Sequence, residues 1–522
     1  MSWAQGAALL FAGGPVLYVL LGSLIGVLLG SLPGLGPVFV LTLILPLTLH
    51  LPAIDALVML VAGYTSAVFG GAITAVVFNV PGHPGNIATT FEGPIMAKQG
   101  RAGEAVVAIG VAGALGGLVA TGFLVFVSPL IVNAALGLQP VDYFMLAVFG
   151  LSMVAAASRG RVLAGIMLGG VGVMISTIGP DIVTGTYRFT FGSAYLQSNG
   201  VPLALVAVGV FAIGSGLVMM EESWRGPKAN VPQVSLRGGI GAGVRAVVRH
   251  PVSVLRSSVV GVVMGVIPGL GITLSNLAAY GVEKWFGRRS TWGTGNVVGV
   301  MAPEAADGAT LIAELVPAFT LGIPGAATSA LILAALALHG IQSGPGFFQS
   351  GSPVTAGMLL SMPISQIVIA ALGILLAPIV VWTARIPRQI VGPAIVVVGA
   401  VGAYAVSGAV TDVLAALIFG FVGYGILKLR LPLAPIVMGT VLGPLAEKNF
   451  DRVQILDKAT HHVAFFQPMA LVLGVLCLVS FFAPLSARLL RRRRGAEEVL
   501  SSTSGSNAVA EERSPSASSE VR

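Results

Sequence analysis

The chain has 522 residues, of which 55% are hydrophobic and only 9% are charged, and its formal net charge is +8. Soluble domains carry about 25% charged residues, and a soluble chain of this length would need several cores, each with a charged surface. The composition therefore excludes a water-soluble protein and predicts a polytopic membrane protein. The basic balance does not indicate nucleic-acid binding, because Arg488 and the four Arg residues at 491–494 follow an apolar stretch, which is typical of a cytoplasmic membrane anchor.

Apolar stretches recur along the chain, and a helix needs about 20 apolar residues to cross a bilayer. The first Lys or Arg is Lys98, so we expect insertion through the helices themselves and no cleavable signal peptide. Uninterrupted candidate spans are 105–131, 140–157, 162–179, 201–219, 355–383, 389–407, 410–428 and 463–486. Apolar segments that are shorter or broken by Gly and Pro are 16–50, 54–96, 258–280, 300–339 and 432–445.

Positive charges predict the orientation, because cytoplasmic loops are rich in Lys and Arg. The most basic internal segment is 221–256, which we interpret as a cytoplasmic linker between two halves. The predicted organisation is a first transmembrane repeat at 1–220, this linker, a second transmembrane repeat at 257–487, and a basic anchor with a disordered tail at 488–522. The C-terminus is expected on the cytoplasmic side.

The two halves share motifs in the same order. The pattern G-x-x-x-G-x-x-P-G-L-G occurs at 26–36 and again 235 residues later, at 261–271. A hydrophobic residue followed by Pro-Gly occurs at 80–82 and again 243 residues later, at 323–325. Basic residues flank the second P-G-L-G segment but not the first, which predicts opposite orientations. We therefore expect an all-α membrane fold of two inverted-topology repeats with re-entrant hairpins and broken helices, with about 11–12 membrane segments, as in secondary transporters.

Pro-Gly pairs inside apolar segments predict broken helices, because Pro removes a backbone donor and Gly leaves the chain unrestrained. In a membrane such breaks persist only where protein or a water-filled cavity covers them. The N-terminus of a half-helix carries partial positive charge and free N–H groups, which suit a carboxylate. An alternative is that these residues only kink packed helices. The predicted anion-binding breaks are Pro33, Gly34 and Gly36, Pro81 and Gly82, Pro268, Gly269 and Gly271, and Pro324 and Gly325.

Uncharged polar residues surround these breaks and are predicted to bind substrate, although Ser and Thr also cap helices. His83 lies between two Pro-Gly pairs, where it would bind substrate, sense protons or stay solvated in a loop. The remaining candidates are Asn79, Asn86, Thr89 and Thr90 in the first half, and Thr273, Ser275, Asn276, Thr328 and Ser329 in the second half.

Three acids lie in apolar surroundings. Glu304 and Asp307 share one face of a predicted helix, and Glu314 follows two to three turns later. Intramembrane carboxylates are functional candidates by default, so Glu304 and Asp307 are predicted to hold Na⁺ or a proton. The alternative is that they lie in the first turn of the helix at the cytoplasmic interface. No nucleophile elbow, phosphate loop or metal-ligand spacing is found, so neither an enzyme nor a cofactor or structural metal is predicted.

Together these motifs resemble the large permease subunit of the tripartite tricarboxylate transporters, over about residues 15–485. The resemblance implies a translocation subunit that uses an ion gradient, a small four-span membrane subunit as partner, and a periplasmic binding protein that delivers a carboxylate. Asp307 and His83 depart from the family pattern, which has Asn and a small residue there. The matching stretches are GSLPGLGP at 30–37, NVPG at 79–82, EGPIMAKQGRAGE at 92–104, IPGLG at 267–271, APEAA at 302–306 and LGIPG at 321–325.

The expected function is therefore secondary active import of organic di- or tricarboxylates through a bacterial inner membrane, driven by a Na⁺ or proton gradient. A gradient-independent anion channel is the main alternative. A membrane-embedded enzyme is disfavoured by the absence of catalytic motifs.

Overall fold

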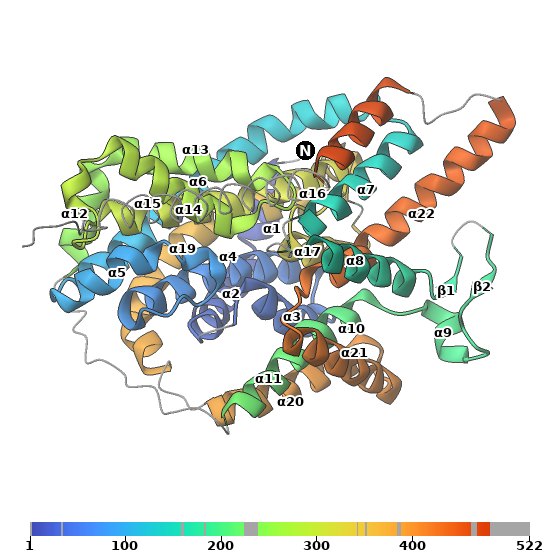
Figure 1. Cartoon of the computed structure of the whole chain (residues 1–522), viewed down its shortest axis with the longest axis horizontal. Coiled ribbons are helices and arrows are strands. Elements are labelled where there is room, and N and C mark those ends of the chain that lie inside the picture. The colour runs from blue at the N-terminus through green and yellow to red at the C-terminus, as the bar shows by residue number, and fades with distance from the viewer. Residues whose placement is uncertain are drawn as a thin grey trace, which may run out of the picture.

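The computed structural model describes residues 3–480, except 33–34, 157, 159–160, 182–183, 224–238, 342, 350–351, 384–387 and 461–466. The predicted break at Pro33 and Gly34 and the predicted anchor and tail at 488–522 therefore lie outside the described residues. Within them the chain is helical, apart from one antiparallel pair of two-residue strands (Figure 1). The predicted all-helical fold class is confirmed.

The N-terminal part forms two long helices in its centre and shorter helices around them. Pro37 starts α3, at the first helical position where a missing N–H costs nothing. The elements are α1 (Trp3–Leu10), α2 (Gly14–Gly30), α3 (Pro37–Thr48), α4 (Ala53–Phe78), η1 (Pro84–Asn86), α5 (Thr89–Lys98), α6 (Ala102–Ala135), α7 (Pro140–Ala156) and α8 (Val162–Ser176).

A middle section follows, with the short strands and a helix that contains a π-helical turn. These elements are β1 (Gly179–Pro180), β2 (Tyr187–Arg188), α9 (Ala194–Asn199), α10 (Leu203–Ala207), η2 (Val208–Ile213) and α11 (Gly214–Ser223). The last three form one continuous helix, which covers most of the span predicted at 201–219.

The C-terminal part begins inside the segment predicted as a linker, 221–256, whose described residues from Gly239 onward are mostly helical. The elements are α12 (Gly239–Arg249), α13 (Pro251–Val266), α14 (Gly271–Phe286), η3 (Arg289–Thr291), α15 (Val298–Ala313), α16 (Leu315–Leu321), α17 (Ala327–Leu338), α18 (Pro345–Gln349), α19 (Pro353–Thr383), α20 (Arg388–Ser407), α21 (Val410–Lys428) and α22 (Ala434–Thr460). A further apolar helix covers Pro468–Ser480.

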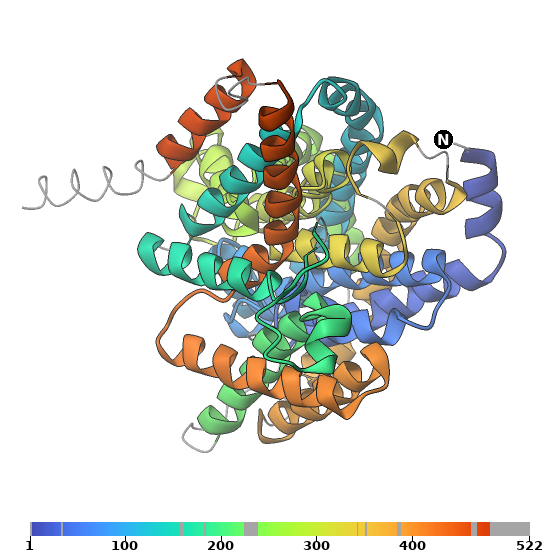
Figure 2. The same cartoon turned by 90° about the vertical axis from the view of Figure 1, so that its right-hand side faces the viewer.

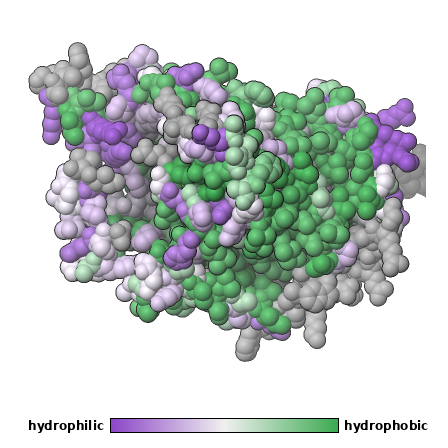
Figure 3. Space-filling model, turned by 180° about the vertical axis from the view of Figure 1, so that it is seen from behind, coloured by the Kyte–Doolittle hydropathy of each residue, from purple (hydrophilic) through white to green (hydrophobic). Residues whose placement is uncertain are grey.

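Six described helices are long and apolar enough to cross a membrane, and up to eight if two bent pairs each form one span. The bent pairs are α1 with α2, at 68°, and α12 with α13, at 76°. The expectation of 11–12 segments also counted shorter apolar elements such as α3, α7, α8 and α17. Figure 3 shows a broad hydrophobic surface with hydrophilic residues gathered toward its ends, as a lipid-facing protein requires.

Helix α4 is the centre of the molecule, because nearly all of its residues are buried, as expected of a helix that is apolar on every side. Helix α2 packs on α4 through Gly22, Gly26 and Gly30. A Cβ atom on Gly26 would lie 2.3 Å from the carbonyl oxygen of Gly63, so only glycine permits this approach. Helix α13 packs on α15 in the same way, through Gly261 and Gly265.

The two repeats exchange helices. Helix α6 of the first repeat packs against α12, in the segment predicted as the linker, and against α13 and α15 of the second repeat, whereas α19 of the second packs against α1, α2 and α4 of the first. The corresponding small-residue contacts are Gly239 on Gly103 and Gly6 on Ala356. Figures 1 and 2 show the central helices interleaved, with α20, α21 and α11 grouped at one side. Gly82, Pro324 and Gly325 of the described breaks are buried, Pro268 and Gly269 are half-buried, and Asn79 is exposed.

Candidate functional site

The second Pro-Gly break has the same backbone path in both repeats. Asn79 ends α4 with φ +55°, and Gly322 ends α16 with φ +73°, both in the left-handed region. Four residues later the chain is extended at His83 and at Ala326, and each of these residues caps the next helical turn. The motif match between the halves is therefore a match in structure.

A close approach explains why glycine follows each of these prolines. A Cβ atom on Gly82 would lie 2.2 Å from the Cα atom of Gly71, and one on Gly325 would lie 3.2 Å from the Cβ atom of Glu314. Gly71 and Glu314 are themselves 243 residues apart, the spacing between the two Pro-Gly pairs. In each repeat the glycine of the break therefore packs against a residue of the preceding helical segment, and these two residues, Gly71 and Glu314, occupy the same place in the repeat.

The two breaks of each repeat also meet each other. In the second repeat the N–H of Gly269 donates to the carbonyl of Gly325 at 2.9 Å. In the first repeat a Cβ atom on Gly36 would lie 3.1 Å from the Cβ atom of His83. Gly85, in the first repeat, lies against the side chain of Ile272 at the start of α14 in the second. The structure therefore brings the described breaks together at the interface of the two repeats.

A buried polar cluster lies at this interface. The Asn86 amide donates to Glu304 Oε1 at 3.1 Å, and the Thr89 hydroxyl donates to the same oxygen. Asn276 accepts from the backbone N–H of Ala88 at 2.8 Å and donates to Asp307 Oδ2 at 3.2 Å. The cluster is thus formed by α14 and α15 of the second repeat and by the break of the first.

The two acids of this cluster are enclosed by protein. Glu304 is 3% exposed and Asp307 is 0% exposed, and they lie in the second and third turns of α15. They therefore do not sit in the first turn at an interface, which was the alternative to an ion-binding role. All the hydrogen-bond partners found for them, Asn86, Thr89 and Asn276, are neutral.

Three polar atoms of the cluster are buried without a hydrogen-bond partner among the described residues. They are Asn86 Oδ1, Asp307 Oδ1 and His83 Nε2. Buried polar atoms almost always have partners, and exceptions indicate a site for a ligand, an ion or water. Oxygen-rich sites of carboxylates, amides and hydroxyls suit hard cations, so the arrangement is able to bind a cation or a proton.

His83 is 8% exposed, so it is not a solvated loop residue, which was one of its three interpretations. Its Nδ1 accepts from the N–H of Gly85 at 3.0 Å, which fixes the ring at the cap of η1. Its Nε2 is buried and has no hydrogen-bond partner among the described residues.

Several predicted residues have local structural roles. Thr90 donates to the carbonyl of Ile87 at 2.6 Å, a local bond back to the chain. Ser329 accepts from the N–H of Ala326 at 2.9 Å, as in a capping box. Thr310 donates to Ser275 at 2.6 Å between α14 and α15. Asn79 is exposed, and Thr273 is half-buried in the first turn of α14.

Sequence reasoning missed two residues, Tyr64 and Glu92. The Tyr64 hydroxyl forms a hydrogen bond with Glu314 Oε1, which is also bonded to the Thr328 hydroxyl, in a second buried polar group. The repeat spacing of 243 aligns Tyr64 with Asp307, and this signal would have found it. The Glu92 carboxylate accepts from the backbone N–H groups of Gly295 at 2.8 Å and Asn296 at 3.0 Å, which ties α5 to the loop before α15.

A surface pocket is lined by His50 and residues 404–408. It lies beyond the C-terminal end of α3, whereas Gly36 and the break lie at the N-terminal end of that helix. The polar cluster and not this pocket is therefore the candidate site.

Comparison with known proteins gives a consistent result. A family model described as "Tripartite tricarboxylate transporter TctA family" matches residues 16–438. The chain is 33% identical over 474 residues to a protein of Agrobacterium vitis described as "Uncharacterized 52.8 kDa protein in TAR-I ttuC' 3'region", with 90% of this chain and 93% of that protein covered. It is also 33% identical to an "Uncharacterized protein in TAR-II ttuC' 3'region" of the same organism, over 43% of this chain and 94% of that protein. No solved structure matches.

Proposed function

Because the chain belongs to the TctA family, the large membrane subunits of tripartite tricarboxylate transporters, we propose that it is the translocating subunit of a secondary active importer of organic di- or tricarboxylates. As a family member it is a multi-pass membrane permease component and not an enzyme. The observation that carries the proposal is the buried cluster of Glu304, Asp307 and Asn276 at the point where the repeat breaks meet.

The two acids provide the cation side of the mechanism. A carboxylate that is enclosed by protein and has only neutral partners is costly to keep charged. It therefore binds a cation or a proton, which removes or balances the buried charge. The unpartnered oxygens of Asp307 and Asn86 lie in this group and supply further ligand positions. We assign the coupling ion, Na⁺ or H⁺, to this cluster.

The helix ends provide the anion side. Helix α14 starts at Gly271, with Thr273 in its first turn, and the first N–H groups of a helix have no partner within it. A substrate carboxylate at this end would lie near Glu304 and Asp307, and like charges repel. Substrate and coupling cation would therefore favour each other's binding, which is the reciprocal coupling that symport requires.

The remaining parts of the proposal concern the assembly and its place. We propose a small four-span membrane subunit and an extracytoplasmic binding protein as partners, in a bacterial inner membrane, with the C-terminus in the cytoplasm. The basic residues at 488 and 491–494 support this orientation.

The test is an uptake assay in cells that lack carboxylate uptake and express this chain with a small four-span membrane protein and a secreted binding protein from the same source. A panel of labelled di- and tricarboxylates is offered with and without a Na⁺ gradient, and with and without a protonophore. We expect accumulation against the substrate gradient that stops when the coupling ion gradient is collapsed. Omitting the binding protein is expected to stop uptake as well.

The alternative, an anion channel, gives a different result in the same assay. A channel equilibrates its anion without accumulation, needs no binding protein and does not respond to either ion gradient. Downhill flux with these properties would overturn the proposal.

A further inference from the structure

The second buried polar group, formed by Tyr64, Glu314 and Thr328, is separate from the cluster around Glu304. Glu314 is 1% exposed and lies at the junction of α15 and α16, seven residues after Asp307. The Tyr64 hydroxyl contacts Glu314 Oε1 and lies 2.8 Å from the carbonyl oxygen of Leu311. The Thr328 hydroxyl contacts the same Oε1 atom, and Glu314 Oε2 has no partner among the described residues.

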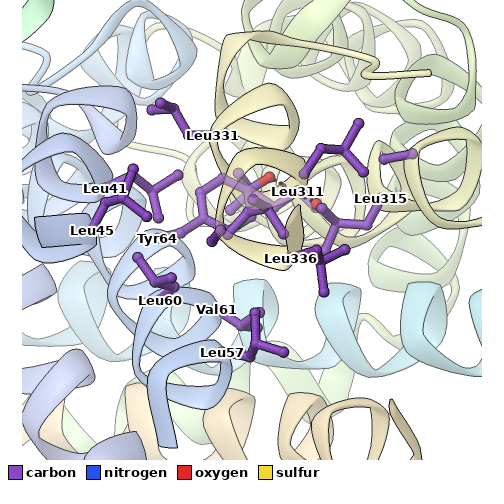
Figure 4. Packing of buried hydrophobic residues seen from close by; sticks show 14 of the residues in the cluster. Leu41, Leu45, Leu57, Leu60, Val61, Tyr64, Leu311, Leu315, Leu331 and Leu336 are labelled. Carbon is purple, nitrogen blue, oxygen red and sulfur yellow. Dashed lines mark hydrogen bonds between the residues drawn. The ribbon is translucent and has the colours of Figure 1, made fainter. Parts of the chain in front are cut away.

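The surroundings of this group are apolar. Figure 4 shows Tyr64 enclosed by leucines, including Leu41 of α3, Leu60 of α4 and Leu331 of α17. The enclosing elements α3, α16, α17, α18 and α19 contain no Asp, Glu, His, Lys or Arg at described positions. A charged carboxylate without a cation is therefore poorly solvated here.

Charged residues on other neighbouring elements pair elsewhere or lie far along their helices. Glu104 of α6 pairs with Arg101, Arg256 of α13 pairs with Glu283, and Glu447, the first charged residue of α22, pairs with Arg188. Asp55 lies in the first turn of α4, nine residues before Tyr64. Glu304 and Asp307 bond to the first cluster. Tyr64 is thus the titratable partner that Glu314 contacts.

The hydrogen-bond donors around Glu314 favour its protonated form. A hydroxyl carries one proton, so Tyr64 donates either to Leu311 or to Glu314. If the carboxyl were ionised, both hydroxyls would donate to one oxygen while the other, charged oxygen had no donor. If Glu314 is protonated on Oε1, its O–H donates to the Tyr64 oxygen, Tyr64 donates to Leu311, and Thr328 donates to Oε1. Every proton then has one acceptor, and the unpartnered Oε2 atom belongs to a neutral carboxyl and not to a charged one.

The position of this group follows the repeat. Tyr64 in the first repeat and Asp307 in the second are related by the 243-residue spacing. Each is connected by hydrogen bonds to the second Pro-Gly break of the other repeat. Asp307 reaches the break of the first repeat through Asn276, and Tyr64 reaches Thr328, just after the break of the second. The group is therefore the repeat-related counterpart of the first cluster.

We infer that Glu314, with Tyr64 and Thr328, is a proton-binding site distinct from the Glu304 and Asp307 cluster, and that it holds its proton in the conformation described here. That Glu314 binds a proton does not depend on the proposed function. That this proton is a coupling ion does depend on it. The carboxyl binds one H⁺ from the side to which the site opens and releases it to the other side.

The test has two arms and a matched control. Glu314→Gln keeps the size of the side chain and cannot release a proton. The control is Asp412→Asn, because Asp412 is also buried and bonded to a tyrosine and a serine, Tyr195 and Ser407, but each of its oxygens has its own donor at the start of α21. This arrangement is that of an ordinary ionised helix-start carboxylate.

The first arm measures infrared difference spectra of the full purified chain between alkaline and acidic solution. We expect carbonyl absorption of protonated buried carboxyls in the wild type and in Asp412→Asn, and the loss of the component that belongs to Glu314 in Glu314→Gln. The second arm measures uptake against a proton gradient in the complete system. We expect uptake by the wild type to rise at least 5-fold with the gradient and uptake by Glu314→Gln to change less than about 2-fold.

The outcomes separate the two proposals. An unchanged infrared band in Glu314→Gln, or a wild-type gradient response in that variant, would overturn the proton site. If the wild type accumulates substrate with neither a proton gradient nor a Na⁺ gradient, the proposed importer function fails. If it responds to Na⁺ alone, the coupling role of this proton fails, and the infrared arm still decides whether Glu314 binds a proton.

Discussion

Asn276 is the residue that joins the two repeats at the candidate site, because both ends of its amide are engaged. Its oxygen accepts from the backbone of Ala88 in the first repeat, and its nitrogen donates to Asp307 in the second. The amide therefore sets the distance between the break and the acidic pair.

We expect Asn276→Ala to reduce uptake at least 10-fold while membrane insertion is kept. The change leaves the N–H of Ala88 and Asp307 without a partner, and each unsatisfied buried group costs about 1–3 kcal/mol. The check combines the uptake assay with the amount of protein that extracts in monodisperse form. The control is Asn449→Ala, another buried asparagine, whose amide bonds only to the carbonyl of Leu445 in its own helix. Wild-type uptake kinetics in Asn276→Ala would remove this residue from the site.

At the scale of residues, the sequence predicted which types would gather but not how they pair. Asn86, Thr89 and Asn276 are predicted near breaks, and Glu304 and Asp307 on one face of a helix in apolar surroundings. The structure places all five in one cluster. Their partners could not be read from the chain, because the bonds of Asn86, of Thr89 and of the Asn276 oxygen cross between repeats, and the bond from Asn276 to Asp307 joins two different helices. Thr90 is also predicted at the site, but its hydroxyl bonds to the carbonyl of Ile87, three residues earlier in the chain, and not to the cluster.

At the scale of elements, the glycine spacing predicts how helices pack. Gly22, Gly26 and Gly30 repeat every four residues on α2, so they share one face and permit a close approach to α4. Two features had no such signal. The helix predicted across 300–339 has an additional break at Glu314, between α15 and α16, and the linker expected at 221–256 contains α12. Both depend on what packs against them, and not on local propensity.

We expect Gly26→Ala to destabilise the protein by about 1–3 kcal/mol, as overpacking a tight interface does. The added Cβ atom would lie 2.3 Å from the carbonyl oxygen of Gly63 and 2.8 Å from the Cβ atom of Ser66. Its control is Gly122→Ala in α6, where an added Cβ atom meets nothing within 4 Å. Because alanine forms helices better than glycine, the control variant should unfold at the wild-type temperature or slightly above it.

The measurement is thermal unfolding of each variant in the same detergent. Equal unfolding temperatures for Gly26→Ala and Gly122→Ala would mean that α2 and α4 are not held in this close contact.

At the scale of the whole molecule, the exchange of α6 and α19 between repeats links the two halves. The chain order and the shared motifs predict two repeats, and the structure adds that neither repeat can bury its central helix without the other. Helix α4 is buried on all sides, and one of the helices that cover it is α19, which follows it by about 300 residues in sequence. Sequence spacing alone carries no information on such a contact.

The inverted orientation of the repeats is a prediction that labelling can test. Lys98 ends α5 and Leu338 ends α17, and the repeat spacing places these two helices in corresponding positions. If the repeats are inverted, the two helix ends lie on opposite sides of the membrane, with Lys98 in the cytoplasm. Both side chains are exposed and accept a reporter.

The experiment uses a Cys477→Ser background, since Cys477 is the single cysteine of the chain. Lys98→Cys and Leu338→Cys are then treated with a membrane-impermeant maleimide on intact cells and on inside-out vesicles. We expect Leu338→Cys to react only in cells and Lys98→Cys only in vesicles. Arg288→Cys, which follows α14 at an exposed position beside other basic residues, should behave like Lys98→Cys. Reaction of Lys98→Cys and Leu338→Cys from the same side would mean that the repeats run parallel, and an anion site between oppositely oriented half-helices would then be geometrically impossible.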